Sequence, residues 1–483
     1  MSKTSMLVSP RVQPPLDENF YPAVLVNRSF QQKVRKSGVP LVIGLERGEH
    51  EFSRFETKVF PDNHSYADAN LHYIERLLKF LLWQQGAYKV YVGGSNTVAK
   101  HLRKVYAAGG AQDFDYHFMG EQVYERPFDV VSSKLDKVPA SCVTRKQIGR
   151  NLAGCRIGFD LGASDRKVSA VVDGNPIFSE EVIWEPRKHS DPEYHYQEIL
   201  KALKMAASKM PRVDAIGGSS AGIYIDNRPM VASLFRGVPQ ENFGEIKNLF
   251  LRLSQEMKAP LEVINDGDVT ALAGSMSIND NGILGIALGS SEAAGYVNMD
   301  GHIMGWLNEL AFAPIDYSPN APVEEWSGDK GCGASYFSQQ CVFRLAPKAG
   351  IEIPSDLTDA EKLKFVQQKL ESGHAGARKI WQSMGIYLGY GLAHYADFYE
   401  IKHVLILGRC TSGRGGDLLL EGVRKVWRAE FPELLERIKL HLPDEKVRRV
   451  GQSVAAASLP SSDSKEETAL SRMQRLILRD HLQ

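Results

Sequence analysis

The stretch from Ile264 to Gly274 constrains the fold of this chain more than any other feature. The run Leu261 to Ile264 is typical of a β-strand; Asn265 and Asp266 follow it in a turn, and the small residues from Val269 to Met276 favour a helix. Open α/β sheets bind ligands at the carboxyl ends of their strands, where this carboxylate would lie. The pattern predicts an α/β fold with Asp266 as a candidate general base, although an ordinary Asn-Asp-Gly turn is an open alternative.

The composition fits a folded globular protein and disfavours several classes. With 483 residues, 43% hydrophobic and 24% charged, the chain is long enough for two or three domains. Its 58 Lys and Arg balance 58 Asp and Glu, so no net charge favours nucleic acid or an anionic membrane. The five cysteines are scattered, which indicates reduced thiols, and no window reaches the roughly 18 apolar residues of a membrane span. We expect a cytoplasmic protein with no nucleic-acid or membrane partner.

Proline content and hydrophobic periodicity divide the chain into segments. Residues 1–36 carry four prolines among polar residues and are expected to form an arm, with regular structure beginning after it. A β-hairpin and an amphipathic helix from Ala67 to Gln85 predict a small α/β unit over residues 37–132. The polar stretch 133–154 is expected to be a linker. The remaining segments are a first lobe over 155–280, a second lobe over 281–460 and a C-terminal helix over 461–483.

Two loops combine small residues with hydroxyl groups. One follows the predicted strand that ends at Asp160, and the other joins the strands of a predicted hairpin at Gly289. Small residues let backbone N–H groups approach phosphate oxygens, and Ser164, Ser290 and Ser291 can add hydroxyl donors. Two such turns could clamp one polyphosphate, although each alone is equally typical of an ordinary hairpin.

The order of these motifs resembles the ROK sugar kinases and bacterial glucokinases of the actin-like ATPase superfamily. The resemblance covers roughly residues 155 to 460 and rests on Asp160 to Ser164, Gly217 to Gly222, Asn265-Asp266, Leu288 to Ser291, Asn308 to Phe312, Ser327 to Ser338 and Leu407 to Arg409. It implies two lobes of ribonuclease-H-like topology closing over ATP and a sugar or polyol. The small N-terminal α/β unit would be an addition to that fold.

The resemblance also implies roles for individual residues. Asp266 would be the general base, in a cleft between the two lobes. The residues expected to bind the sugar with it are Ser219, Ser220, Gly222, Asn265 and Glu309. Those expected to bind ATP are Asp160, Gly162 and Ser164 in the first phosphate loop, Gly289, Ser290 and Ser291 in the second, and Gly408 and Arg409 in the nucleoside loop. Mg²⁺ would bridge the phosphates and meet Asp160 through water or phosphate.

Several positions depart from the family pattern. Phe312 replaces a histidine that serves both sugar and zinc, and only Cys332 remains of the zinc-binding cysteine cluster, so we expect no zinc. Ala334 replaces a second sugar-binding glutamate, and Asp165 stands where a lysine is usual. Glucose specificity is therefore not inherited, and the substrate could be a sugar derivative or another polyol.

Two functional classes stay open. The first is an ATP-dependent carbohydrate kinase, favoured by Asp160 and Asp266; the second is a catalytically inactive sugar- or nucleotide-sensing protein, favoured by Phe312 and Ala334. A repressor would need a basic recognition helix, which residues 37–132 do not offer. A homodimer is an open alternative for the oligomeric state.

Overall fold

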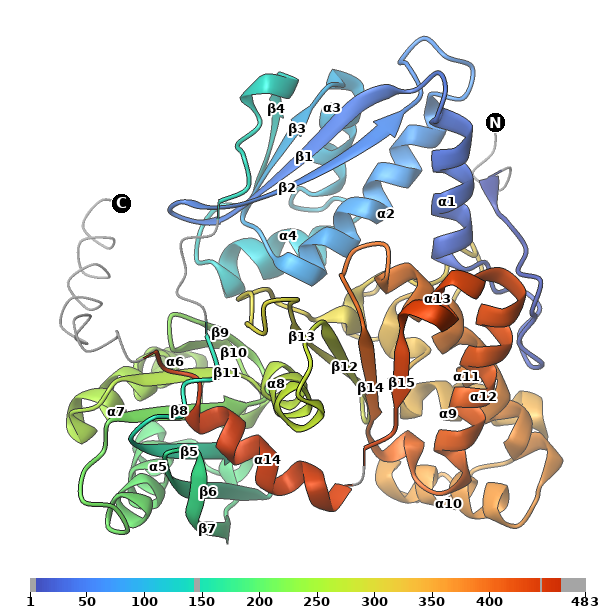
Figure 1. The fold of residues 1–483 in the computed structure, drawn as a ribbon. Coiled ribbons are helices and arrows are strands. Elements are labelled where there is room, and N and C mark those ends of the chain that lie inside the picture. The colour runs from blue at the N-terminus through green and yellow to red at the C-terminus, as the bar shows by residue number, and fades with distance from the viewer. Residues whose placement is uncertain (1–5, 143–147, 444, 462–483) are drawn as a thin grey trace. The chain divides into compact units, whose positions relative to one another are not determined.

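The structure is a computed structural model that describes residues 6–142, 148–443 and 445–461. The C-terminal helix expected over 461–483 lies outside these ranges, apart from its first residue. The described chain forms two compact units (Figure 1). The first unit comprises Met1–Arg145, Ile286–Ala294 and Gly305–Leu442, and the second comprises Lys146–Gly285, Gly295–Met304 and Pro443–Gln483.

A sheet with the strand order β2-β1-β3-β4 forms the N-terminal part of the first unit. Strand β1 (Val39–Gly48) pairs antiparallel with β2 (Glu51–Val59), as the predicted hairpin requires, and with β3 (Lys89–Gly93). Strand β4 (Asp129–Ser133) pairs parallel with β3. Helix α2 (Asp68–Gln85) coincides with the predicted amphipathic helix to within one residue, because its apolar spacing continues without interruption.

The turn after β3 opens α3 (Asn96–Val105). The Ser95 hydroxyl accepts a hydrogen bond of 3.2 Å from the Val98 N–H, so Ser95 is the N-cap of this helix. A short helix, α4 (Asp113–His117), follows and continues into a π-helical turn over Phe118–Val123. The sequence Gly93-Gly94-Ser95 therefore has a local structural explanation.

The expected arm contains a helix that the sequence analysis missed. Helix α1 (Ala23–Val34) buries Val24, Val26 and Phe30, so the expectation that regular structure begins after residue 36 is wrong. All four prolines precede this helix, and Pro22 directly before its first residue has a fixed φ that is compatible with a helix start.

The second unit is built on a five-stranded sheet in the order β11-β8-β5-β6-β7 (Figure 1). Strands β5, β8 and β11 are parallel, whereas β5, β6 and β7 are antiparallel neighbours. Their bounds are Cys155–Leu161 for β5, Asp165–Val172 for β6, Asn175–Ile183 for β7, Ala215–Ser220 for β8 and Leu261–Asn265 for β11. A two-stranded hairpin of β9 (Ile223–Ile225) and β10 (Arg228–Val231) follows β8.

Helices connect the parallel strands of this sheet. Helix α5 (Pro192–Ala207) begins at the predicted Asp191 cap, whose carboxylate accepts a hydrogen bond from Glu193 N–H. The single helix predicted from Glu241 to Lys258 is instead two helices, α6 (Phe243–Lys247) and α7 (Leu249–Met257). The break falls at Asn248, a residue type that favours caps and turns over helix interiors, with φ −97° and ψ 0°.

Helix α14 (Glu445–Ala457) completes the core of the second unit (Figure 1). A Cβ atom on Gly158 of β5 would lie 1.9 Å from the carbonyl oxygen of Ser453. One on Gly217 of β8 would lie 1.7 Å from that of Ala456. Only glycines allow this helix backbone to approach the sheet so closely.

A second four-stranded sheet has the order β13-β12-β14-β15 and contains the hairpin predicted at Gly289. Its strands are β12 (Ile283–Leu288), β13 (Glu292–Val297), β14 (His403–Leu407) and β15 (Lys439–His441). The helices of the C-terminal half of the first unit are α9 (Gln339–Leu345), α10 (Asp359–Glu371), α11 (Ala375–Tyr395), α12 (Arg414–Glu430) and α13 (Pro432–Arg437). The predicted capping box of Thr358 and Glu361 opens α10.

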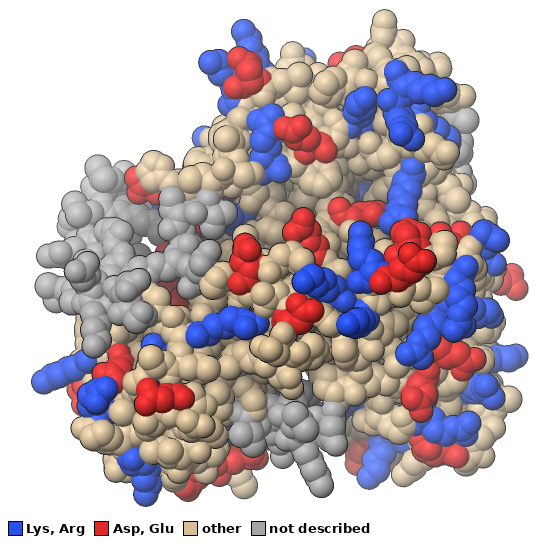
Figure 2. All heavy atoms as spheres, viewed as in Figure 1, with Lys and Arg blue, Asp and Glu red and all other residues tan. Residues whose placement is uncertain are grey.

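The α/β class expected from the sequence is confirmed, since mixed sheets alternate with helices in both units. None of the helices in the described part of the chain is long and apolar enough to cross a membrane. Basic and acidic side chains are intermingled on the visible face of the molecule (Figure 2).

Candidate active site

The carboxyl ends of three parallel strands in the second unit bring several predicted site residues together. Asp160 of β5 pairs in register with Ser219 of β8, and Ser220 of β8 pairs with Asn265 of β11. Asp266 is the first residue of α8 (Asp266–Ile278), which begins where β11 ends. These side chains therefore share one edge of one sheet, where open α/β sheets bind their ligands.

Asp160 is held by its neighbours at this edge. Its carboxylate accepts a hydrogen bond of 2.7 Å from the hydroxyl of the fully buried Ser219. The ammonium group of Lys167 on β6 lies 4.0 Å from Asp160 and 3.3 Å from Asp165. Position 165 lacks the usual lysine, but Lys167, two residues further along, brings a cation to the same carboxylates, which the sequence alone did not predict.

In the first predicted phosphate loop, the hydrogen-bond donors bond to acceptors within the loop itself. The Gly162 N–H donates to the Asp165 carbonyl at 2.9 Å, and the Ser164 hydroxyl donates to the Asp165 carboxylate at 3.0 Å. The indole N–H of Trp184 donates to the Gly162 carbonyl at 2.9 Å. Phosphate could be bound by these donors only after they leave Asp165.

Asn265 has a structural role at the start of α8. Its side-chain oxygen caps the helix by accepting from the Gly267 N–H at 2.7 Å, and its NH₂ group donates to the Gly222 carbonyl at 2.8 Å. The amide thereby ties the loop after β8 to the end of β11. This arrangement fixes the backbone that leads directly into Asp266.

Asp266 is half-buried, and it lies where a carboxylate is favoured. The partial positive charge at the N-terminus of α8 stabilises a negative side chain in the first turn. Burial raises the pKa of Tyr224, and the charge of Asp266 raises it further, so the two groups are neighbours. The Tyr224 hydroxyl donates a hydrogen bond of 2.7 Å to the Ser220 hydroxyl. Tyr224 therefore connects Ser220 with the environment of Asp266.

The second predicted phosphate loop and the nucleoside loop are adjacent within the first unit. The hairpin closes with a hydrogen bond of 3.0 Å from the Gly289 N–H to the Ser291 carbonyl, and Ser290 and Ser291 are exposed. After β14, Gly408 has a φ of 95°, and a Cβ there would lie 2.4 Å from the Leu288 carbonyl oxygen. A glycine is required for this contact, which places the exposed Arg409 on a loop beside the hairpin.

Glu309 and Glu292 form a pair of acidic groups in the first unit. The Glu309 N–H donates to the Trp83 carbonyl at 3.0 Å, so α2 holds this residue in place. Burial, with a further contribution from the negative Glu309, raises the pKa of Glu292 to about 8, despite a hydrogen bond from Tyr395. That bond, 2.9 Å long, reaches Oε1, while Oε2 has no hydrogen-bond partner among the described residues.

Glu292 was missed by the sequence analysis. The signal that could have identified it is a carboxylate at the first position of a strand that otherwise reads Ala-Ala-Gly-Tyr-Val. Gly333 approaches its free oxygen, since a Cβ at that glycine would lie 2.1 Å from Glu292 Oε2. Ala334, where a second glutamate was expected, follows directly in the chain.

Phe312 has become part of an aromatic cluster, which we define as Trp83, Phe114, Phe118, Phe312 and Trp326. The rings of Phe312 and Trp83 lie 4.2 Å apart between centroids, and those of Phe312 and Trp326 lie 5.5 Å apart. This position therefore packs against α2 instead of presenting a polar group to a ligand.

Cys332 lies beside a buried charge network, which comprises Arg76, Lys79, Asp115 and Asp329. Lys79 contacts Asp115 at 2.8 Å and Asp329 at 3.3 Å, and Arg76 contacts Asp329 at 2.7 Å. Burial raises the pKa of the Cys332 thiol to about 12. No group of three His, Cys, Asp or Glu side chains in the described ranges has the geometry of a metal site.

No family model and no curated relative matches the chain. Among solved structures, it is similar to a ROK hexokinase from Thermus thermophilus, at 17% identity and a TM-score of 0.49, over 62% of this chain and 97% of that one. A ROK family glucokinase from Streptomyces griseus, solved with glucose and AMPPNP, is 19% identical with a TM-score of 0.45, over 63% and 99%. A ROK family transcriptional regulator, described as a homolog of the E. coli MLC protein, is 18% identical with a TM-score of 0.49, over 75% and 87%.

The family of these structures is the one that the motif order resembles. Their identities to this chain are all below 20%, and they include both kinases and a regulator. A substrate or a catalytic residue therefore has to be inferred from this chain's own side chains.

Proposed function

We propose that this chain transfers the γ-phosphoryl group of ATP to a hydroxyl of a sugar or sugar derivative, with Asp266 as the general base. The observation that carries the proposal is the convergence of Asp160, Ser219, Ser220 and Asp266 at one sheet edge. Hydroxyl and carboxylate groups at such an edge suit a polyol substrate, because each can exchange hydrogen bonds with its hydroxyls.

The chemical step assigns one task to Asp266. As the substrate oxygen attacks the γ-phosphorus, its proton passes to the carboxylate, the bond from phosphorus to the β–γ bridging oxygen breaks, and ADP leaves. A positioned carboxylate contributes ~10²–10⁴-fold to such a reaction. Ser219 and Ser220 would orient the substrate.

The first unit offers groups that fit ATP. Ser290 and Ser291 expose hydroxyls on a Gly-containing turn, and Arg409 is exposed on the adjacent loop. Hydroxyl, amide and guanidinium donors suit phosphate oxygens. The carboxylate of Asp160 is the oxygen ligand type that Mg²⁺ prefers, and when bound this ion neutralises phosphate charge.

The test is a screen for ADP release across sugars, amino sugars and polyols. We expect turnover of at least one compound and a loss of at least ~10²-fold in Asp266→Asn, because the variant cannot accept the proton. The matched control is Asp226→Asn, which makes the same change at an exposed turn with a φ of 52° that asparagine tolerates. Equal activity of the Asp266→Asn variant and the wild type would refute the assignment of the base.

A sugar- or nucleotide-sensing protein is the second candidate. The observations that favour it are the engagement of Gly162 and Ser164 by Asp165 and the packing of Phe312 in the aromatic cluster. A screen without turnover, together with saturable nucleotide binding, would favour this function over the kinase.

A further inference from the structure

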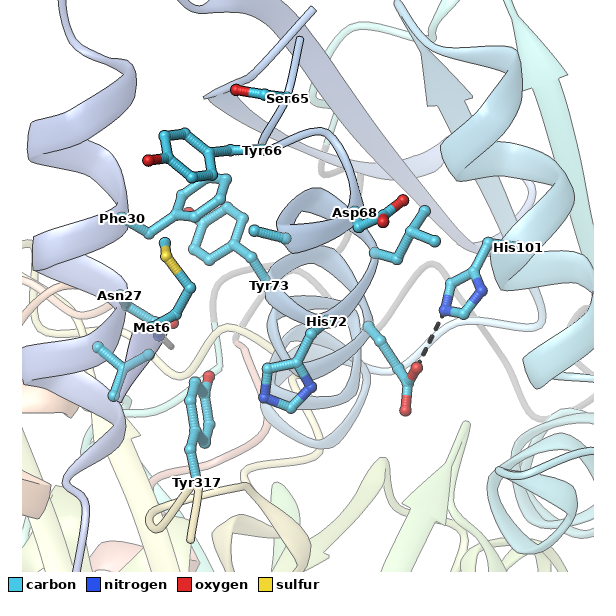
Figure 3. Close-up of a pocket in the computed structure, with 14 residues that line it drawn as sticks. Met6, Asn27, Phe30, Ser65, Tyr66, Asp68, His72, Tyr73, His101 and Tyr317 are labelled. Atoms are coloured by element: carbon cyan, nitrogen blue, oxygen red, sulfur yellow. Dashed lines mark hydrogen bonds and ion pairs between the residues drawn. The ribbon is translucent and has the colours of Figure 1, made fainter. Parts of the chain in front are cut away.

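A pocket of about 240 Å³ lies in the N-terminal part of the first unit, and the proposed kinase reaction does not use it (Figure 3). Helices α1, α2 and α3 line it, together with Met6, the segment at Ser65 and Tyr66, and Tyr317. Its volume is below that of pockets for drug-sized ligands, so a fragment-sized molecule fits it best.

Two buried polar groups in this pocket have hydrogen-bonding capacity that the described residues leave unused. Asn27 and Tyr317 expose only 8% and 6% of their surfaces. They lie near each other, but neither the Asn27 side-chain oxygen nor the Tyr317 hydroxyl makes a hydrogen bond of acceptable geometry with any described residue. Because burying a polar group without a hydrogen bond is unfavourable, these atoms favour a ligand that donates hydrogen bonds.

Aromatic rings form the apolar part of the lining. Phe30 and Tyr73 stack with centroids 4.1 Å apart, and His72 meets Tyr317 edge-on at 5.5 Å. In Figure 3, Tyr66 lies above this pair of stacked rings, and it is 41% exposed. Aromatic faces attract cations as well as apolar groups.

The charges in the lining are acidic. The 14 described lining residues include Asp68 and Glu75 but no lysine or arginine. Glu75 is bonded to His101 at 3.0 Å, and Asp68 is exposed at the start of α2. Arg76, whose guanidinium lies 5.9 Å from the Tyr317 ring, is paired with Asp329 and does not line the pocket.

We propose that this pocket binds a small organic ammonium ion with an aromatic body. The ring of the ligand packs against Phe30, Tyr73 and Tyr317, its N–H groups donate to Asn27, and Asp68 supplies the opposite charge. This site gives the N-terminal region a ligand-binding function that is independent of phosphoryl transfer.

The test measures binding to the full-length protein by calorimetry. The probe is phenethylammonium, and the matched probes are neutral 2-phenylethanol and anionic phenylacetate. We expect saturable binding of the ammonium ion and binding at least ~10-fold weaker for the other two, since charge attraction and cation–π contact are lost.

Variants locate the site. Asp68→Asn, an isosteric change at an exposed position, is expected to weaken binding about 3- to 10-fold, whereas Asp129→Asn on the exposed edge of β4 leaves it unchanged. Asn27→Leu is expected to weaken binding further, with a thermal melt to establish that this buried change still folds. Equal affinity for the ammonium ion and its neutral analogue, absence of binding, or equal effects of Asp68→Asn and Asp129→Asn would overturn the proposal.

Discussion

Two regions of the molecule contain positions at which the family resemblance predicts ligand contacts or departs from its pattern, but their structures differ. At the edge of the sheet in the second unit, Asp160, Ser219 and Ser220 lie at strand ends and hydrogen-bond one another or a neighbouring tyrosine. Around α2 in the first unit, Phe312 and Cys332 are enclosed by rings and paired charges.

The difference is explained by what packs against each region. The strand ends are followed by short loops, so Asp160 stays partly exposed, although Ser219 and Ser220 beside it are fully buried. Phe312 and Cys332 instead meet Trp83 and Lys79 of α2 in the additional N-terminal segment. An inserted segment can thus convert expected ligand positions into interior packing, while the strand ends keep their polar character.

The largest expected effect among the stability predictions is at the charge network. Lys79 is fully buried, and attraction to Asp115 and Asp329 outweighs that burial and raises its pKa. Lys79→Met leaves Asp115 buried without its partner, and we expect a loss of about 3–5 kcal/mol in unfolding free energy by urea denaturation. The matched Lys100→Met change on the exposed face of α3 is expected to cost little.

A double variant sharpens this prediction. Lys79→Met combined with Asp115→Leu removes both charges, so much of the lost stability should return. If the double variant were as unstable as Lys79→Met alone, the unpaired Asp115 carboxylate would not be the cause of the lost stability. The contrast between the charge network around α2 and the sheet edge of the second unit would then be weakened.

The next effect concerns Glu292. The pKa of its carboxyl group is raised to about 8, so between the ordinary glutamate value of 4.5 and pH 8 the folded protein holds a proton that the unfolded chain has lost. The resulting stabilisation is complete below that lower value and disappears as the pH rises to about 8. As the pH rises through this window, the unfolding free energy of the wild type should therefore fall by about 1.4 kcal/mol per pH unit more than that of Glu292→Gln.

Denaturation midpoints at a series of pH values give the measurement. Glu309→Gln is the informative companion, because removing this neighbouring charge lowers the pKa of Glu292, so the loss of stability ends at a lower pH and is smaller in total. Parallel pH profiles of stability for the wild type and Glu292→Gln would contradict the prediction that protonation of Glu292 stabilises the folded protein.

The smallest effect is expected at the sheet edge itself. The Tyr224 hydroxyl donates to Ser220, and the variants Tyr224→Phe and Ser220→Ala each remove this bond. A double-mutant cycle should give a coupling of about 1 kcal/mol in unfolding free energy. Strict additivity of the two changes would show that the edge is not held by this contact.

The sequence predicted the elements whose signals are local. The strand ending at Asn265, the turn at Asp266 and the helix after it follow from a few adjacent residues, and so does α2 with its uninterrupted apolar spacing. Helix α1 was missed because the prolines before it obscured a short apolar pattern. The fold class therefore came from patterns that neighbouring residues determine.

The site was less predictable because its geometry depends on distant partners. Lys167 reaches Asp160 from a neighbouring strand, and Glu292, at the start of β13, faces Gly333 from a distant part of the sequence. The first pair lies directly across the β5–β6 hairpin and could have been inferred from it, but nothing in the sequence spacing indicates the second pair. The roles of Asp266 and the other site residues stay predictions that the proposed assays test.

The position of α14 has a consequence for synthesis of the protein. The sheet of the second unit includes Gly158 and Gly217, yet the helix that covers them is made only after the whole first unit. During translation, the face of the sheet that α14 covers therefore stays exposed until α14 has been synthesised. A nascent chain that stalls before Glu445 would be a substrate for chaperones, and the second unit could complete its core only after α14 has been synthesised.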